Sequence, residues 1–139
     1  MKQPLRSVLL VDDNDADNYL HRLIIREAGV AEDIVDQPDG VDAIDYLKAL
    51  HDQNDADPPE LIFLDINMPR MNGWEFLEAY EQLPEPLRQA VVVIMLTTSI
   101  FPDDQERAQA RPGFCGFLNK PLTEADLLEL LRKHFGDRF

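Results

Sequence analysis

The sequence predicts an α/β fold, namely a doubly wound, five-stranded parallel sheet with helices on both faces. The first reason is that short apolar runs alternate along the chain with segments of helical periodicity, five times in succession. The second is that three runs are almost continuously hydrophobic, as strands buried on both faces of a sheet are: residues 7–11, 61–64 and 91–96. Parallel strands joined through helices imply right-handed crossovers.

The remaining elements follow from weaker local signals. Residues 33–35 and 114–118 are shorter apolar runs, as expected of edge strands. The helix candidates are residues 15–28, 39–50 and 73–83, a short helix from Pro102, and residues 125–135. In the first of them Leu20, Leu23, Ile24 and Ala28 recur at helical spacing before Gly29, a favourable residue for ending a helix. Pro84 ends the third, and Thr123 with Asp126 forms a near-capping box before the last.

Composition limits the class of protein. With 139 residues the chain fits one domain, expected to span residues 1–139 with a core over about 6–135. The net charge of −14 disfavours binding to nucleic acid, and no apolar run is long enough to span a bilayer or to form a signal peptide. A single cysteine, Cys115, excludes an internal disulfide and fits a cytoplasmic protein, while the polar segment 51–60 is the expected mobile loop.

Polar side chains follow four of the five predicted strands. Asp12 and Asp13 come after the first strand, Asp65 after the third and Thr97 after the fourth. Asn119 and Lys120 follow the fifth strand. Because ligands of open α/β sheets bind at the carboxyl ends of the strands, these groups are expected to meet at one edge.

The chemistry of these polar residues indicates a phosphoryl-transfer site. Three carboxylates in one cleft need a counter-charge, and Mg²⁺ prefers oxygen ligands that include one or two carboxylates and a phosphate. Lys120 can neutralise a further charge or hold an oxyanion, and Thr97 offers a hydroxyl. A carboxylate can also attack phosphorus and form an aspartyl phosphate. The set therefore predicts a Mg²⁺-assisted site at which an aspartate is phosphorylated.

Four short motifs contain these polar residues, namely "VDD" (11–13), "LDINMPRMNGWEF" (64–76), "MLTTS" (95–99) and "NKP" (119–121). On these motifs, and over almost its whole length, the sequence resembles the receiver domain of two-component response regulators, of the chemotaxis-regulator-like, single-domain type. The resemblance implies a flavodoxin-like sheet of strand order 2-1-3-4-5.

The resemblance implies a role for each matching acid. Asp65 corresponds to the phosphoacceptor, Asp13 to the direct metal ligand, and Asp12 to the acid that holds a metal-bound water. Asn67 corresponds to the residue whose backbone carbonyl also binds the metal. The implied cofactor is Mg²⁺, with Mn²⁺ as a possible substitute.

Other positions correspond to residues that respond to the phosphoryl group. Thr97 and Lys120 match the hydroxyl and the ammonium that contact it, and Phe117 matches the aromatic switch residue, here without the tyrosine hydroxyl. Thr98 and Ser99, with Asn67, flank the expected path of the attacking water and are candidates for tuning hydrolysis. The resemblance also implies a cis peptide bond between Lys120 and Pro121.

The sequence departs from the family pattern in a few places. Asn72 stands where aspartate is common, and the loop before the third strand is longer than usual. The fourth helix is short and is closed by "RPGF" (111–114), with Pro112 where the family has a small residue. The departures at residues 111–114 concern the geometry of the fourth helix, and none of the departures alters the chemistry of the site.

As a receiver, the chain is expected to be a phosphoacceptor signalling protein rather than an enzyme in the usual sense. A histidine kinase would donate the phosphoryl group, and the surface of helix 4, strand 5 and helix 5 would then signal to a target protein or a phosphotransfer protein. A homodimer is a further possibility, and neither nucleic acid nor membrane insertion is expected. The alternatives are a phosphorelay intermediate, a Mg²⁺-dependent aspartyl-phosphate phosphatase of the haloacid dehalogenase class, and a phosphorylation-independent interaction module.

Several residues favour a structural interpretation. His21, His51 and His134 are isolated and are expected at the surface, with His21 a minor candidate for contact with the kinase. At least one of Trp74 and Phe76 is expected in the core, and Cys115 as a small buried side chain. Asp15 and Asp17 are assigned to the start of the first helix, where acids are favourable.

Overall fold

Five parallel strands form the centre of the protein. The structure is a computed structural model that describes residues 3–53, 57–89, 91–98, 101–109 and 114–139, without the side chains of residues 109, 114 and 115. The strands are β1 (Val8–Val11), β2 (Ile34–Gln37), β3 (Leu61–Asp65), β4 (Val92–Thr97) and β5 (Phe114–Asn119). Their order in the sheet is β2-β1-β3-β4-β5, as the resemblance implies. The two weak runs are therefore the edge strands, and the three apolar runs are central.

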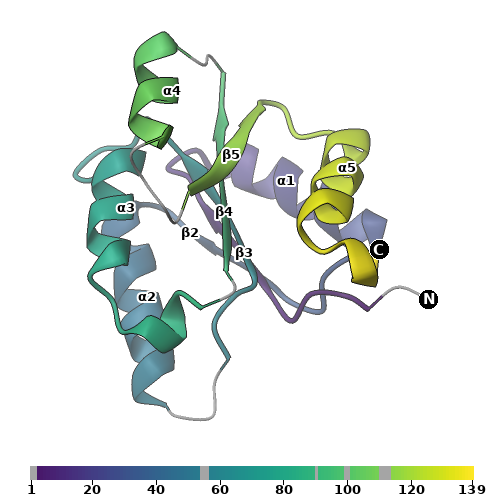
Figure 1. Ribbon diagram of the computed structural model, residues 1–139, viewed down its shortest axis with the longest axis horizontal. Coiled ribbons are helices and arrows are strands. Elements are labelled where there is room, and N and C mark those ends of the chain that lie inside the picture. Colours follow the sequence, from purple (N-terminus) through teal and green to yellow (C-terminus); the bar gives the residue numbers. More distant parts are fainter. Residues whose placement is uncertain (1–2, 54–56, 90, 99–100, 110–113) are drawn as a thin grey trace.

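Helices cover both faces of this sheet. They are α1 (Asp15–Ala28), α2 (Gly40–Asp52), α3 (Gly73–Glu81), α4 (Pro102–Gln109) and α5 (Glu124–His134), with short 3-10 turns η1 (Glu85–Leu87) and η2 (Gly136–Arg138). Figure 1 shows α1 and α5 on one side of the sheet and α2 and α3 on the other. The prediction of a doubly wound sheet is confirmed. No helix in the described ranges has the length and apolar character needed to cross a bilayer.

The alternation of side chains along each central strand builds two cores. On β1, Leu9 and Val11 pack with α2 and α3, whereas Val8 and Leu10 pack with α1 and α5. β3 and β4 follow the same alternation, and all of their described apolar side chains except the half-buried Val92 are buried. Trp74 and Phe76 both lie in the core on the side of α3. This burial on both faces explains the continuous hydrophobicity of the central strands.

Local signals place most helix boundaries correctly. α1 has the predicted bounds, but its N-cap is Asn14, whose side chain accepts a hydrogen bond from the backbone N–H of Asp17 at 3.0 Å. Asn72 caps α3 through a complete capping box with Glu75, so this departure from the family pattern preserves the helix start. α2 extends to Asp52, which shortens the predicted loop, and residues 54–56 of that loop lie outside the described residues.

The apolar face of α1 differs from the one the spacing predicts. Leu20 and Leu23 are each 38% exposed, whereas the buried residues of the helix are Asn18, His21 and Ile25. The helix therefore turns two polar side chains toward the sheet. Their surroundings are described with the site below.

A buried glutamate ties the two ends of the chain together. Arg138 in η2 donates from Nη1 to Oε1 of Glu60 at 2.5 Å and from Nη2 to the carbonyl of Pro4 at 2.8 Å. The backbone N–H of Arg6 donates to Oε2 of Glu60 at 2.7 Å. Burial alone would raise the pKa of Glu60, but the hydrogen bonds from Arg138 and Arg6 outweigh it and lower the pKa. The C-terminal turn therefore stabilises the sheet near the start of β3.

Arg138→Met is expected to lower the free energy of unfolding by about 2 kcal/mol, because it leaves the Glu60 carboxylate buried with one partner fewer. Since folding lowers the pKa of Glu60, this contribution is complete above the ordinary glutamate pKa of about 4.3 and is lost as pH falls through the lower folded-state pKa. Urea unfolding at pH 7 measures the loss. Arg132→Met is the control, since Arg132 is exposed and makes no side-chain hydrogen bond or ion pair within the described residues. Equal effects of the two substitutions would contradict the prediction.

Candidate functional site

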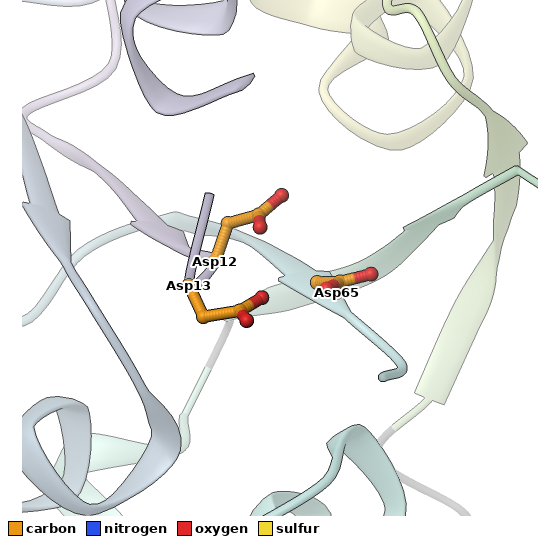
Figure 2. A group of neighbouring side chains, drawn as sticks. All are labelled: Asp12, Asp13 and Asp65. Carbon is orange, nitrogen blue, oxygen red and sulfur yellow. The ribbon is translucent and has the colours of Figure 1, made fainter. Parts of the chain in front are cut away.

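Three carboxylates meet at the carboxyl ends of neighbouring strands. Asp65 ends β3, and Asp12 and Asp13 follow β1, which pairs with β3 so that Val11 lies opposite Leu64. One oxygen from each of the three acids lies within 4.8 Å of the others. Figure 2 shows Asp12 and Asp13 beside Asp65, with the carboxylate of Asp13 directed toward it. Asp12 and Asp65 are buried and Asp13 is exposed, so the cluster opens to solvent on the side of Asp13.

Lys120 is the cation of this cluster. Its Nζ donates to Oδ2 of Asp12 at 2.7 Å and to Oδ2 of Asp17 at 2.9 Å, and it lies 3.4 Å from Oδ1 of Asp65. The backbone N–H of Lys120 donates to the carbonyl of Thr97 at 2.8 Å, which fixes the loop after β5 to the end of β4. The Lys120–Pro121 bond is cis, as the resemblance implies.

The electrostatics of the cluster shift two pKa values. Burial and the neighbouring charge of Asp12 raise the pKa of Asp65 to about 6, although Lys120 opposes the shift. Burial alone would lower the pKa of Lys120, but hydrogen bonds to Asp12 and Asp17 outweigh it and raise the pKa. At neutral pH the site therefore holds an ionised Asp65 in surroundings that disfavour its charge, and a firmly protonated lysine.

The other predicted residues differ in their burial. Thr97 is buried at the end of β4, opposite Asn119 in the β4–β5 register. Asn67 and Thr98 are exposed, and Ser99 lies outside the described residues. Phe117 is half-buried on β5.

The indole ring of Trp74 contacts both Phe117 and helix α4. The Trp74 ring lies edge-on to Phe117, with centroids 6.2 Å apart, and its Nε1 donates to Oδ1 of Asp104 at 3.3 Å. The Arg107 guanidinium lies 5.8 Å from the Trp74 centroid, within cation–π distance. Trp74 itself is only 5% exposed, so α3, α4 and β5 meet around one nearly buried side chain.

Gly73 is a supporting residue whose role the sequence analysis missed. Its N–H donates to the carbonyl of Ile66 at 2.7 Å, which folds the start of α3 back onto the end of β3. A Cβ at this position would lie 2.9 Å from the carbonyl oxygen of Asp65 and 3.0 Å from Cα of Ile66. The only sequence signal is a glycine at a helix start, which does not reveal a close backbone approach.

One prediction on α1 was incomplete and another was wrong. Asp17 lies in the first turn of α1, as predicted, but its carboxylate also accepts a hydrogen bond from Lys120 inside the site. His21 is not a surface residue, since it is 2% exposed and faces the sheet behind Asp12, and burial lowers its pKa. This placement removes His21 as a contact for the kinase. His51 is exposed and His134 is half-buried, while the side chain of Cys115 lies outside the described part of the chain.

Asn18 is a second supporting residue that was missed. Its Nδ2 donates to the backbone carbonyl of Asp12 at 2.9 Å, and its side chain is buried beside His21. Oδ1 of Asn18 and Nε2 of His21 have no hydrogen-bond partner among the described residues. A polar layer therefore lies directly behind the acid cluster.

The donor set fits a hard divalent cation. Its three carboxylates converge from two strand ends, and one of them is exposed, so that water and an incoming phosphoryl group can complete the coordination. The site contains no thiolate or imidazole at ligand distance within the described residues, which disfavours softer metals.

The strand order, the acid cluster and the lysine at the carboxyl edge of the sheet agree with the receiver domain that the resemblance implies. The chain belongs to the response regulator receiver domain family, whose pattern matches residues 8–132. Proteins of this family are signalling proteins rather than classical enzymes, so the phosphatase alternative is set aside.

Individual relatives agree with this assignment. The chain is 32% identical to response regulator Rcp1 of Synechocystis over 93% of its own length and 86% of that protein. It is 29% identical to the polar-differentiation response regulator DivK of Brucella ovis over 95% of its length and 98% of that protein. A crystal structure of a two-component response regulator from Cytophaga hutchinsonii superposes with a TM-score of 0.86 at 35% identity, covering 96% of this chain and 99% of the other.

Proposed function

We propose that the chain acts as a stand-alone receiver that accepts a phosphoryl group from a histidine kinase on Asp65. The observation that supports this most directly is the placement of Asp65 between two further carboxylates and the Lys120 ammonium, 3.4 Å from its Oδ1. Such a set combines a nucleophile, ligands for a cation and a counter-charge for a phosphoryl group. The alignment with 86% of Rcp1 and 98% of DivK supports a single domain over residues 1–139 with a core over about 6–135.

The acids have distinct roles in this proposal. Asp13 and Asp65 would ligate Mg²⁺ or Mn²⁺ directly, Asp12 through a water, and Asn67 through its backbone carbonyl. The bound cation supplies charge neutralisation for the transferring phosphoryl group. A carboxylate oxygen of Asp65 forms the new bond to phosphorus as the bond to the kinase histidine nitrogen breaks. With a pKa of about 6, Asp65 is ionised and nucleophilic at neutral pH.

The remaining residues respond to the product. Thr97 and Lys120 hydrogen-bond the new phosphoryl oxygens, and Phe117 repacks as Thr97 moves. The surface formed by α4, β5 and α5 changes with them and is recognised by a target protein or a phosphotransfer protein. Thr98, Ser99 and Asn67 would tune hydrolysis, which resets the switch. The chain would act in the cytoplasm, where a histidine kinase presents its phosphohistidine, and a phosphorelay or a homodimer is compatible with the same chemistry.

The test is phosphorylation by a small donor. In the presence of Mg²⁺, acetyl phosphate is expected to add a single phosphoryl group, measured as intact protein mass, and chelation of the cation is expected to prevent it. Mg²⁺ alone is expected to raise the melting temperature, because it relieves repulsion among the three acids. Absence of the adduct with Mg²⁺ present would exclude the proposal, and unchanged amide spectra after phosphorylation would exclude the switch.

A further inference from the structure

The Lys120 ammonium hydrogen-bonds two carboxylates and lies close to a third before any phosphoryl group arrives. An ammonium has three N–H donors, and here its nitrogen contacts three carboxylates, Asp12 at 2.7 Å, Asp17 at 2.9 Å and Asp65 at 3.4 Å. The lysine side chain is 11% exposed, so solvent offers it few other partners. A phosphoryl group that draws Lys120 toward Asp65 therefore competes with the hydrogen bonds that hold the ammonium at Asp12 and Asp17.

The three carboxylates around Lys120 differ in their burial and in their other hydrogen bonds. Asp12 is 6% exposed in its side chain, and its Oδ1 also accepts from the backbone N–H of Asn14 at 2.9 Å. Asp65 carries the phosphoryl group itself. The Asp17 side chain is 33% exposed, and Lys120 is its only side-chain partner within the described residues. Water can replace Lys120 at Asp17 more readily than at Asp12, since the Asp17 carboxylate is already partly hydrated.

We propose that Asp17 is a positioning residue for Lys120, a partner that holds the ammonium in the unphosphorylated protein and is displaced by the phosphoryl group on Asp65. This inference rests on the proposed function. It assigns α1 a direct part in the switch, through a residue five positions after Asp12. Because the phosphoryl group must compete with Asp17 for Lys120, Asp17 weakens the phosphorylated state relative to the resting one.

The consequence is measurable with beryllofluoride, a phosphoryl mimic, in the presence of Mg²⁺. Asp17→Asn is expected to bind beryllofluoride about three- to fivefold more tightly than the wild type, as for loss of one partly exposed competing ion pair. Amide NMR titration gives the dissociation constants. The substitution leaves the helix cap intact, because Asn14 caps α1 through the backbone N–H of Asp17 and not through its carboxylate.

Asp15→Asn is the matched control. It removes the same charge from the same helix turn, but Asp15 makes no side-chain hydrogen bond or ion pair within the described residues. The difference in dissociation constant between the two variants should persist at 0.5 M salt. The Debye length there is about 4 Å, so salt screens the 2.9 Å contact between Lys120 and Asp17 far less than it screens repulsion between distant charges.

The outcomes separate the inference from the proposed function. If the wild type and both variants fail to bind beryllofluoride, the proposed function fails and the inference with it. If the wild type binds but Asp17→Asn equals Asp15→Asn, or if their difference disappears at high salt, the role of Asp17 is overturned and the proposed function stands.

Discussion

An Asp65→Asn protein is expected to accept no phosphoryl group from acetyl phosphate and yet to be more stable than the wild type when no divalent cation is present. The first effect follows because an amide is not a nucleophile toward phosphorus. The second follows from the pKa of Asp65, which burial and the charge of Asp12 raise to about 6. Because folding raises the pKa of Asp65, ionisation of this carboxyl destabilises the folded protein. The contribution of Asp65 to the free energy of unfolding is therefore highest at low pH and falls as pH rises from the ordinary aspartate pKa of 3.8 through the folded-state pKa of about 6. At pH 7, without a divalent cation, Asp65→Asn should raise the free energy of unfolding by roughly 1–3 kcal/mol.

Two measurements check this pair of effects. Intact mass after incubation with acetyl phosphate and Mg²⁺ reports transfer, and urea unfolding at pH 7 with a chelator reports stability. Mg²⁺ should then stabilise the wild type more than the variant, because the variant offers one carboxylate fewer. Asp15→Asn, an acid-to-amide change on the exposed start of α1, should retain transfer. Transfer to Asp65→Asn would refute the assignment of the acceptor, and a lower stability without metal would refute the repulsion among the acids.

Gly73→Ala is expected to destabilise the fold by about 1–3 kcal/mol and to slow phosphorylation strongly. The added Cβ would lie 2.9 Å from the Asp65 carbonyl oxygen, and the neighbour is backbone that cannot rotate away. The start of α3 or the end of β3 must therefore move. Either movement displaces Asp65 relative to Asp12 and Asp13, and misplacement of a nucleophile by a fraction of an ångström lowers the rate of an in-line reaction.

Gly136→Ala provides the control for Gly73→Ala. Nothing lies within 4 Å of a Cβ built at Gly136, which is in the C-terminal turn η2. Thermal unfolding and the initial rate of phosphorylation by acetyl phosphate distinguish the two variants. The same stability and the same rate in both proteins would show that the close approach at Gly73 does not hold the acceptor in place.

The central architecture could be predicted from the sequence because its signals are local. Continuous apolar runs predict strands buried on both faces, and the polar residue after each run predicts the edge at which the site forms. Asp12, Asp13 and Asp65 were found in this way, and the structure brings them together. The strand order and the cis bond before Pro121 came from the resemblance, since no local pattern determines either of them.

The face of α1 could not be predicted in the same way. Helical spacing of Leu20 and Leu23 indicated a buried stripe, but both are partly exposed while Asn18 and His21 are buried. Periodicity assumes that the buried face of a helix is its most apolar face. Beside a charged site the favourable contacts are polar, and Asp17 therefore reaches Lys120 although its position predicted only a helix start. Gly73 was missed for a related reason, because a close backbone approach has no composition signal of its own.

Trp74 has a practical consequence. It is the only tryptophan in the chain, and it contacts Phe117 from β5 and Asp104 and Arg107 from α4. Its fluorescence therefore comes from one place, the junction between the helix that follows the acceptor strand and the surface proposed to carry the signal. The protein contains its own optical probe, so rapid-mixing experiments can follow the response in real time without an attached dye.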